Sequence, residues 1–326
     1  MRDATGERDC VIALDVGGTG MKGALVDRDM AVLHTVRRAT PRRWGPDAVI
    51  AEIAAVLHEL DRNAVTRELT VRGAGVVVPG IVDEETRTAV YSANLGWRDL
   101  PLADYLEGAS GLPVTLGHDV RAGGVAECRL GAGRGADDVW FVPIGTGISA
   151  AVFCDGRPVR ARGYAGELGH VVVDPGGEPC VCGARGCLEG VASAAAVAAA
   201  YSARSGRRVE GAASVAERLT QGDPDARAVW ARAVEALSAA LATAATLLAP
   251  EVVVLGGGLA EAGGLLLDPL RASLARRLTF QRRPELLLAE LGDMAGCLGA
   301  GLAAWQAAGG VPSAQHPPVS LSEVAS

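Results

Sequence analysis

Short apolar runs joined by a glycine-rich turn open the chain. Residues 11–14 and 21–26 form two such runs, and Asp15-Val16-Gly17-Gly18-Thr19-Gly20 lies between them. A third run covers residues 30–36. Two strands around a tight glycine turn are typical of a β-hairpin, and its turn exposes backbone N–H groups.

The pattern changes to helical spacing over residues 46–62. Apolar residues recur there on one helix face, at Val49, Ile53, Val56, Leu57 and Leu60. Apolar runs at residues 74–78 and 114–116 then predict buried strands. The first run ends at Pro79-Gly80, and the second leads into Gly117-His118-Asp119.

The opening pattern returns in the middle of the chain. Residues 139–142 are apolar, Pro143-Ile144-Gly145-Thr146-Gly147 follows, and residues 148–153 are apolar again. When Gly18-Thr19-Gly20 is laid over Gly145-Thr146-Gly147, strand falls on strand without a gap. This register indicates an internal duplication, with chance similarity between two strand-turn-strand units as the alternative.

The second half is predominantly helical by its spacing. Alanine-rich helices are predicted near residues 192–200 and 226–248, with the apolar run 236–249 as a core helix rather than a membrane span. Residues 252–255 form a buried strand that opens into Gly256-Gly257-Gly258. A last helix is expected over residues 299–308, and residues 311–326 are expected to be a disordered tail.

Composition narrows the class of protein. The chain has 326 residues, of which 49% are hydrophobic, so two globular lobes are expected. A net charge of −7 argues against a nucleic-acid partner. The start is polar and carries no signal peptide, and the scattered cysteines are those of a reducing compartment, so we expect a cytoplasmic protein without membrane contact.

A cluster of cysteines carries the strongest chemical signal. Cys180, Cys182 and Cys187 lie within eight residues, with glycines between them that allow tight turns. With His170 as a fourth ligand they predict a closed tetrahedral zinc site. A disulfide is the alternative, although a Cys-x-Cys bridge is strained and leaves one thiol over.

Two carboxylates flank this predicted zinc site. Glu167 and Glu189 bracket the ligands, so folding around the metal brings both carboxylates near His170. One imidazole nitrogen would bind zinc and leave the other for a ligand. Salt bridges to arginine are the alternative role of the two glutamates.

The motif Glu-x-Gly-His, followed by Cys-x-Cys-Gly-x-x-Gly-Cys-x-Glu, resembles the signature of the ROK family (repressors, open reading frames, kinases). The resemblance implies an α/β fold of two ribonuclease-H-like lobes, as in the actin-like ATPase and sugar-kinase superfamily, with a zinc-binding loop. We expect a first lobe at residues 1–117 and a second at residues 118–298. The last helix would pack back on the first lobe.

The two hairpin turns are the predicted phosphate sites. Glycines allow the backbone to approach phosphate oxygens, and threonine hydroxyls add donors, at Gly17, Gly18, Thr19, Gly145, Thr146 and Gly147. Asp15 is placed to hold Mg²⁺ through water, or alternatively to cap the turn. Gly256, Gly257 and Gly258 suit an adenosine, and Glu261 breaks the dinucleotide-binding pattern Gly-x-Gly-x-x-Gly.

Phosphoryl transfer to a hydroxyl also needs a proton acceptor. Asp119 follows a buried strand and resembles the family's catalytic aspartate, with a turn aspartate as the alternative. The resemblance implies that the sugar contacts Asn94 and the glutamates and histidine of the zinc module, and Gly80 would let backbone approach it. Asn94 could instead stabilise a turn.

Four positions depart from the family pattern. Gly20 stands where lysine is frequent, and Ser149 where glycine is common. His118 and Arg121 replace asparagines around the catalytic aspartate, and the residue at 118 normally touches a sugar hydroxyl. Histidine there weakens the assignment of glucose as the substrate.

The resemblance therefore predicts an ATP-dependent sugar kinase with Mg²⁺ and structural Zn²⁺, and glucose is the leading substrate. Another hexose or N-acetylhexosamine, such as N-acetylmannosamine or fructose, is the alternative. A sugar-sensing regulator of the same family is the alternative from another class. Such regulators carry a DNA-binding domain before the first hairpin, where this chain has ten residues before Val11. A homodimer or homotetramer is usual for the family.

Overall fold

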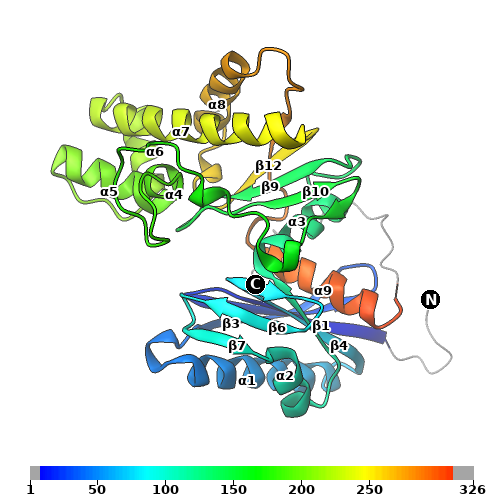
Figure 1. Cartoon of the computed structure of the whole chain (residues 1–326). Helices are drawn as coiled ribbons and strands as arrows, with labels where there is room; N and C mark the ends of the chain where they lie inside the picture. The colour runs from blue at the N-terminus through cyan, green and yellow to red at the C-terminus, as the bar shows by residue number, and fades with distance from the viewer. Residues whose placement is uncertain (1–7, 311–326) are drawn as a thin grey trace. The chain divides into compact units, whose positions relative to one another are not determined.

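The computed structural model describes residues 8–310, and the expected tail at residues 311–326 lies outside the described part. The chain forms two compact units (Figure 1). The first holds residues 8–131, Arg160–Tyr164 and residues 293–310, and the second holds Ala132–Val159 and Ala165–Gly292.

A five-stranded sheet of order β3-β2-β1-β4-β8 forms the centre of the first unit. Its strands are β1 (Arg8–Val16), β2 (Gly20–Asp27), β3 (Val32–Ala39), β4 (Leu69–Val78) and β8 (Val114–His118). The first three are antiparallel neighbours, and β4 and β8 run parallel to β1. Residues 10–14 of β1 are all fully buried, which explains the continuous apolar run in the sequence.

Helices cover both faces of this sheet. They are α1 (Pro46–Val65), α2 (Leu102–Ser110), α3 (Asp119–Leu130) and α9 (Ala295–Ala307), with 3₁₀ turns at η1 (Arg42–Trp44) and η5 (Gly292–Met294). The apolar face predicted for α1 is buried against the sheet. α9 packs against β1, β4 and α3 on the opposite face (Figure 1).

Glycines allow α9 to approach so closely. A Cβ at Gly75 of β4 would lie 2.0 Å from the carbonyl oxygen of Ala300, and one at Gly299 would lie 2.0 Å from that of Ala122. α3 therefore belongs to the first unit, although the boundary expected after residue 117 assigned it to the second lobe.

A small antiparallel sheet adds to the first unit. It consists of β5 (Ile81–Asp83), β6 (Thr88–Ser92) and β7 (Trp97–Leu100), in that order. These strands were not predicted from the sequence, because three to five residues are too few for a periodic pattern. Gly80 enters β5 with φ +105°, and a Cβ there would lie 2.2 Å from the carbonyl oxygen of Tyr91.

The second unit repeats the sheet of the first. Its order is β11-β10-β9-β12-β13, formed by β9 (Val139–Pro143), β10 (Ala151–Cys154), β11 (Arg157–Pro158), β12 (Val252–Gly256) and β13 (Glu285–Leu288). Strand directions also match, since β9 is antiparallel to β10 and parallel to β12. This agreement supports the duplication predicted from the two hairpins. The returning strand begins at Ala151 rather than at residue 148, because Ile148 forms only an isolated bridge to Ile144.

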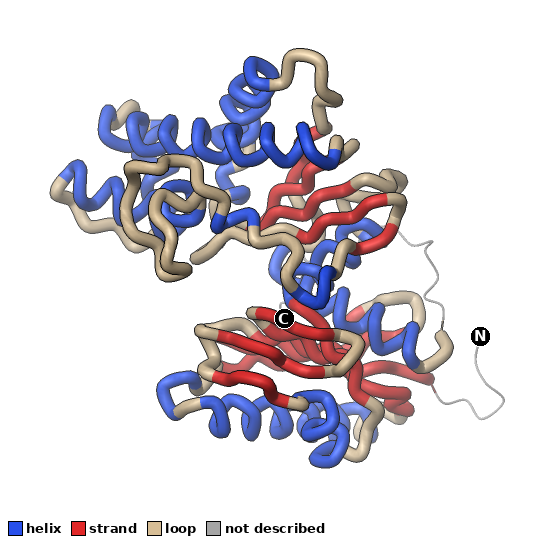
Figure 2. The backbone as a smooth tube through the Cα atoms, in the orientation of Figure 1, coloured by secondary structure: helices blue, strands red, loops and turns tan. Residues whose placement is uncertain are grey.

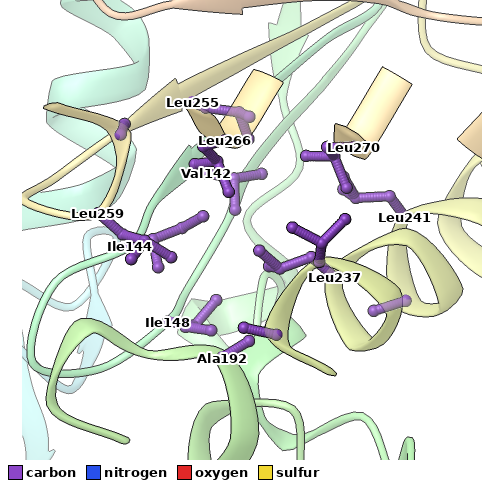
Figure 3. Packing of buried hydrophobic residues seen from close by; sticks show 14 of the residues in the cluster. Val142, Ile144, Ile148, Ala192, Leu237, Leu241, Leu255, Leu259, Leu266 and Leu270 are labelled. Atoms are coloured by element: carbon purple, nitrogen blue, oxygen red, sulfur yellow. The ribbon is translucent and has the colours of Figure 1, made fainter. Parts of the chain in front are cut away.

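The helices of the second unit are α4 (Glu189–Ala192), α5 (Ala194–Ser205), α6 (Ala212–Thr220), α7 (Pro224–Leu248) and α8 (Gly264–Arg277). The remaining 3₁₀ turns are η2 (Ala161–Gly163), which belongs to the first unit, and η3 (Leu168–His170) and η4 (Ala260–Ala262) in the second. Figure 3 shows Leu237 and Leu241 of α7 beside Leu270 of α8 in the core. α7 is long and apolar enough to cross a membrane by length and composition, but its buried face lies in this core, as the sequence predicted.

Candidate functional site

The first hairpin turn lies beside Asn94. The Gly17 N–H donates to the Gly20 carbonyl at 2.8 Å and closes the turn between β1 and β2. A Cβ at Gly18 would lie 3.8 Å from the Cβ of Asn94. The Thr40 hydroxyl donates to the Gly17 carbonyl at 2.6 Å and so stabilises the turn. A predicted phosphate site and a predicted sugar contact are thus neighbours in the first unit.

Two aspartates of this unit interact electrostatically. Asp15 lies near the end of β1, and Asp119 is the first residue of α3. Burial first, and then the charge of Asp119, raise the pKa of the Asp15 carboxyl to about 7, while Lys22 opposes the shift. Lys22 is the cross-strand partner of Asp15, and its Nζ donates to the Asp293 carbonyl at 2.8 Å. A divalent cation bound beside these carboxylates would offset their mutual repulsion.

Asp119 has one carboxylate oxygen engaged within α3. Its Oδ1 accepts the Val120 N–H at 2.7 Å and lies 3.5 Å from Nδ1 of His118. A carboxylate in the first turn is also stabilised by the helix dipole. These contacts hold the side chain at the end of β8 and involve only one of its oxygens.

His118 caps the helix that carries Asp119. It is the last residue of β8, and its Nδ1 accepts the Arg121 N–H at 3.3 Å. Asparagine is a favoured capping residue, and here the ring nitrogen of histidine accepts a backbone N–H in the same role. Because Nδ1 is an acceptor, the neutral ring carries its proton on Nε2 and offers a single donor elsewhere. The sequence did not reveal this capping role.

In the second unit, the other hairpin turn contacts the triple glycine. The Gly145 N–H donates to the Gly147 carbonyl at 2.9 Å, and Leu259 N–H donates to the Ile144 carbonyl at 3.0 Å. Gly257 has φ +77°, and a Cβ there would lie 2.6 Å from the Ile144 oxygen. The two glycine segments predicted to hold a nucleotide therefore lie together.

Glu189 supports this second turn. Its Oε2 accepts the Ile148 N–H at 2.9 Å, and a Cβ at Gly147 would lie 2.5 Å from the same oxygen. The partner is a backbone N–H rather than an arginine, unlike the alternative considered from the sequence. Glu167 is half exposed, and its Oε2 lies 3.8 Å from Nε2 of His170.

A hollow of about 510 Å³ begins at Thr146. Small residues of α5 form one wall, and the segment 208–212 forms the other. The lining includes Ala194, Ala195, Ala198, Ala199, Ser202, Arg208 and Glu210. Such a wall leaves room for a flat ring. The sequence pointed to the alanine run only as a helix, because the pairing of α5 with this loop depends on tertiary structure.

The four predicted zinc ligands converge. Their ligand atoms all lie within 4.8 Å of one another, with 3.7 Å between Cys180 Sγ and His170 Nδ1 and 3.6 Å between the sulfurs of Cys182 and Cys187. A tetrahedral zinc with bonds of about 2.3 Å to sulfur requires edges of about 3.7 Å. All seven cysteines are free thiols, so no disulfide is formed here. The residues fit zinc.

The loop between η3 and α4 has little regular structure (Figure 2). Gly186 has φ +68°, and a Cβ there would lie 1.5 Å from the Asp174 carbonyl oxygen, so only glycine fits. Burial and the neighbouring thiols raise the pKa of the Cys187 thiol to about 12. A divalent metal bound by these cysteines would lower the pKa of their thiols and hold them as thiolates.

His170 connects the cysteine cluster to Glu167. Its Nδ1 faces the cysteines, and its Nε2 faces the glutamate. This is the arrangement in which one nitrogen binds a metal and the other can meet a ligand. The predicted site residues thus form two groups. The group in the first unit consists of Asp15, Gly17, Gly18, Thr19, Asn94, His118 and Asp119. The group in the second unit consists of the glycine turns at residues 145–147 and 256–258 and the zinc module.

The chain is similar to known sugar kinases over most of its length. The chain is 34% identical to the glucokinase of Thermotoga maritima, over 89% of this chain and 95% of that protein. It is 35% identical to the N-acetylmannosamine kinase of Yersinia pseudotuberculosis, over 78% of this chain and 85% of that protein. A crystal structure of a Streptomyces griseus ROK glucokinase with glucose and AMPPNP superposes with a TM-score of 0.79 at 32% identity, covering 91% and 99% of the two chains.

The match extends over nearly the whole chain. The profile of the ROK family aligns with residues 11–307, which include both sheets and the cysteine cluster. The chain belongs to the ROK family.

Proposed function

We propose that this protein transfers a phosphoryl group from ATP to a hydroxyl of a hexose, with glucose as the leading substrate. The observation that carries the proposal is the grouping of Asp119, Asp15, the first glycine turn and Asn94 in one unit. A proton acceptor, a cation site, a phosphate cradle and a hydroxyl-binding amide are what this reaction requires.

Asp119 is the proposed general base. Its Oδ1 is held by the Val120 N–H, which leaves Oδ2 to take the proton from the sugar hydroxyl. Asp15 would hold Mg²⁺ through water, and the cation would neutralise charge on the phosphates. Gly17, Gly18 and Thr19 would bind phosphate oxygens by their N–H and hydroxyl groups.

The second unit is the proposed nucleotide-binding half. Gly145, Thr146 and Gly147 would bind phosphate, and Gly256–258 would let the backbone approach the adenosine. The hollow that begins at Thr146 supports this assignment, since it offers space for a base next to the turn.

The zinc module is the proposed anchor of the sugar site. Zinc would be held by His170, Cys180, Cys182 and Cys187, and it would serve structure rather than chemistry. His170 Nε2 and the carboxylates of Glu167 and Glu189 would bind sugar hydroxyls, and Gly80 would allow backbone to approach. The three thiolates favour a reducing compartment, and hence a cytoplasmic enzyme.

The identity of the sugar depends on few contacts. Relatives named glucokinase and N-acetylmannosamine kinase align at similar identity, 34% and 35%, although the first alignment covers more of this chain, so identity alone does not choose between these sugars. Asn94, Glu167, His170 and Glu189 favour glucose through the family resemblance. Histidine at position 118, where asparagine is common in the family, argues for altered selectivity, because a neutral imidazole and a carboxamide differ in shape and in their number of N–H donors.

A panel of hexoses and N-acetylhexosamines with MgATP, followed by coupled ADP release, tests the proposal. We expect glucose to give the highest kcat/KM. A higher value for an N-acetylhexosamine would replace glucose and keep the kinase. Sugar binding without turnover of any member would favour the sugar-sensing regulator instead.

A further inference from the structure

Arg121 is a buried arginine two residues after the proposed base. It is 4% exposed, its Nε donates to Glu84 Oε1 at 3.0 Å, and its Nη2 donates to the Val82 carbonyl at 3.3 Å. A buried guanidinium needs a counterion, because its charge is otherwise uncompensated. Glu84 is that counterion.

The same carboxylate binds a second arginine. Glu84 Oε2 accepts the Arg160 Nε–H at 2.6 Å. Arg160 begins the segment Arg160–Tyr164, which belongs to the first unit although the residues on both sides belong to the second. Glu84 therefore links this segment to the first turn of α3.

The linked segment has a strained backbone. Ala161 and Arg162 have φ of 44° and 53°, in the left-handed region that residues with a Cβ rarely adopt. Gly163 follows with φ +94°, and a Cβ there would lie 2.6 Å from the Val82 carbonyl oxygen that also accepts from Arg121. Such strain persists only where surrounding contacts hold it, and it is frequent at functional sites.

The contacts continue to the helix that carries the base. The Arg121 N–H donates to His118 Nδ1, so the arginine that Glu84 holds also orients the cap of α3 next to Asp119. In the other direction, the chain passes from Tyr164 to Glu167 in three residues. The Glu84 carboxylate is therefore connected through Arg121 to the helix start at Asp119, and through Arg160 to the segment that precedes Glu167 in the sequence.

We propose that Glu84 is a positioning residue for sugar phosphorylation. It holds Arg121 and Arg160, and through them it fixes both the first turn of α3 and the strained segment that leads to Glu167. This inference rests on the proposed function. It assigns Arg121, where the family commonly has asparagine, a partner that the family pattern does not require.

The contacts of Glu84 with Arg121 and Arg160 predict which kinetic constants change when Glu84 is replaced. Loss of Glu84 would let the α3 turn and the segment 160–164 shift, so the KM for sugar should rise and kcat should fall. The KM for the nucleotide should change less, because two of the three glycine segments proposed to bind it lie in the other unit. The third segment, residues 17–19, has no hydrogen bond or ion pair with Glu84 in the described part of the chain. If Glu84 had only a structural role, its loss would lower stability without this difference between the KM for sugar and the KM for the nucleotide.

Glu84→Gln, Arg160→Gln and the control Glu85→Gln test the inference. Glu85 is the exposed neighbour of Glu84 and has no ion pair among the described residues. We expect Glu84→Gln to lower kcat/KM for the sugar about ten- to a hundredfold, as small misplacements do. Arg160→Gln should act in the same direction, and the double variant should lose less than the product of the two effects.

If Glu84→Gln does not fold, Arg160→Gln tests the inference instead. The Arg160 side chain is 58% exposed, so its replacement does not leave a buried charge unpaired. An active wild type with both variants equal to Glu85→Gln would overturn the inference and leave the proposed function intact. A wild type without turnover of any hexose would overturn both.

Discussion

The Asp15 carboxyl lies partly buried near the carboxylate of Asp119, and burial together with this charge raises its pKa to about 7. One residue closes a strand of the central sheet, and the other opens a helix. The same pair makes stability depend on pH.

Asp15→Asn should stabilise the protein at pH 8 and have little effect at pH 4. In the unfolded chain Asp15 ionises near its ordinary pKa of about 3.8, so between pH 4 and 7 the unfolded state loses a proton that the folded state retains. The resulting penalty grows as pH rises and is complete above pH 7, at roughly 4 kcal/mol, since a pKa change of one unit corresponds to about 1.4 kcal/mol. Thermal unfolding without nucleotide or added divalent cation measures it. Equal effects at both pH values would refute the assignment.

The cysteine cluster should bind one zinc ion per chain. Elemental analysis of purified protein should give about one equivalent, and Cys182→Ser should lower it sharply, because a tetrahedral site loses a ligand. Cys154→Ser, outside the cluster, is the matched control. Chelation should lower both Tm and sugar affinity, since the loop that carries Glu167 and Glu189 loses its anchor. Well under one zinc in the wild type would end this account.

His118→Asn should change the order of preference among glucose, mannose and their N-acetylamino derivatives. Asparagine keeps the cap on α3, so the helix start should survive. With its oxygen in the cap, the amide carries two N–H donors where the neutral imidazole carries one, and sites that pair particular hydroxyls discriminate strongly. The ratio of kcat/KM values for both proteins is the measurement. An unchanged order would mean that His118 serves only as the cap.

Ala199→Trp should raise the KM for ATP and leave sugar binding intact, because the indole would fill the hollow that begins at Thr146. Ala199 is exposed on α5, so the larger side chain needs no space in the core. Ala203→Trp, exposed on the same helix but outside the hollow, is the control. If both variants bind ATP equally well, the adenine ring of ATP does not bind in this hollow.

Local patterns were sufficient for much of this architecture. The apolar run at residues 11–14 and the helical spacing of α1 are direct consequences of burial, so sequence and structure agree there. The cysteine spacing predicted a convergent cluster because its geometry is set within a few residues. The repeat of the hairpin likewise predicted two sheets of one topology.

Contacts between distant segments could not be predicted in this way. The assignment of α3 to the first unit depends on glycines that let α9 approach, and the wall of the hollow depends on α5 meeting residues 208–212. Arg121 looked only like a departure from a pattern, and its partner Glu84 lies 37 residues away in sequence. Such pairs leave no periodic signal.

The most direct test of the central claim compares Asp119→Asn with the wild type. Product formation from glucose and MgATP is followed by phosphorus NMR, and glucose binding by calorimetry. We expect the wild type to form a sugar phosphate. The variant should bind glucose nearly as well and turn over about a hundred- to ten-thousandfold more slowly, since asparagine keeps the shape but cannot accept the proton. Turnover by Asp119→Asn close to the wild-type rate would contradict the assignment of Asp119 as the base.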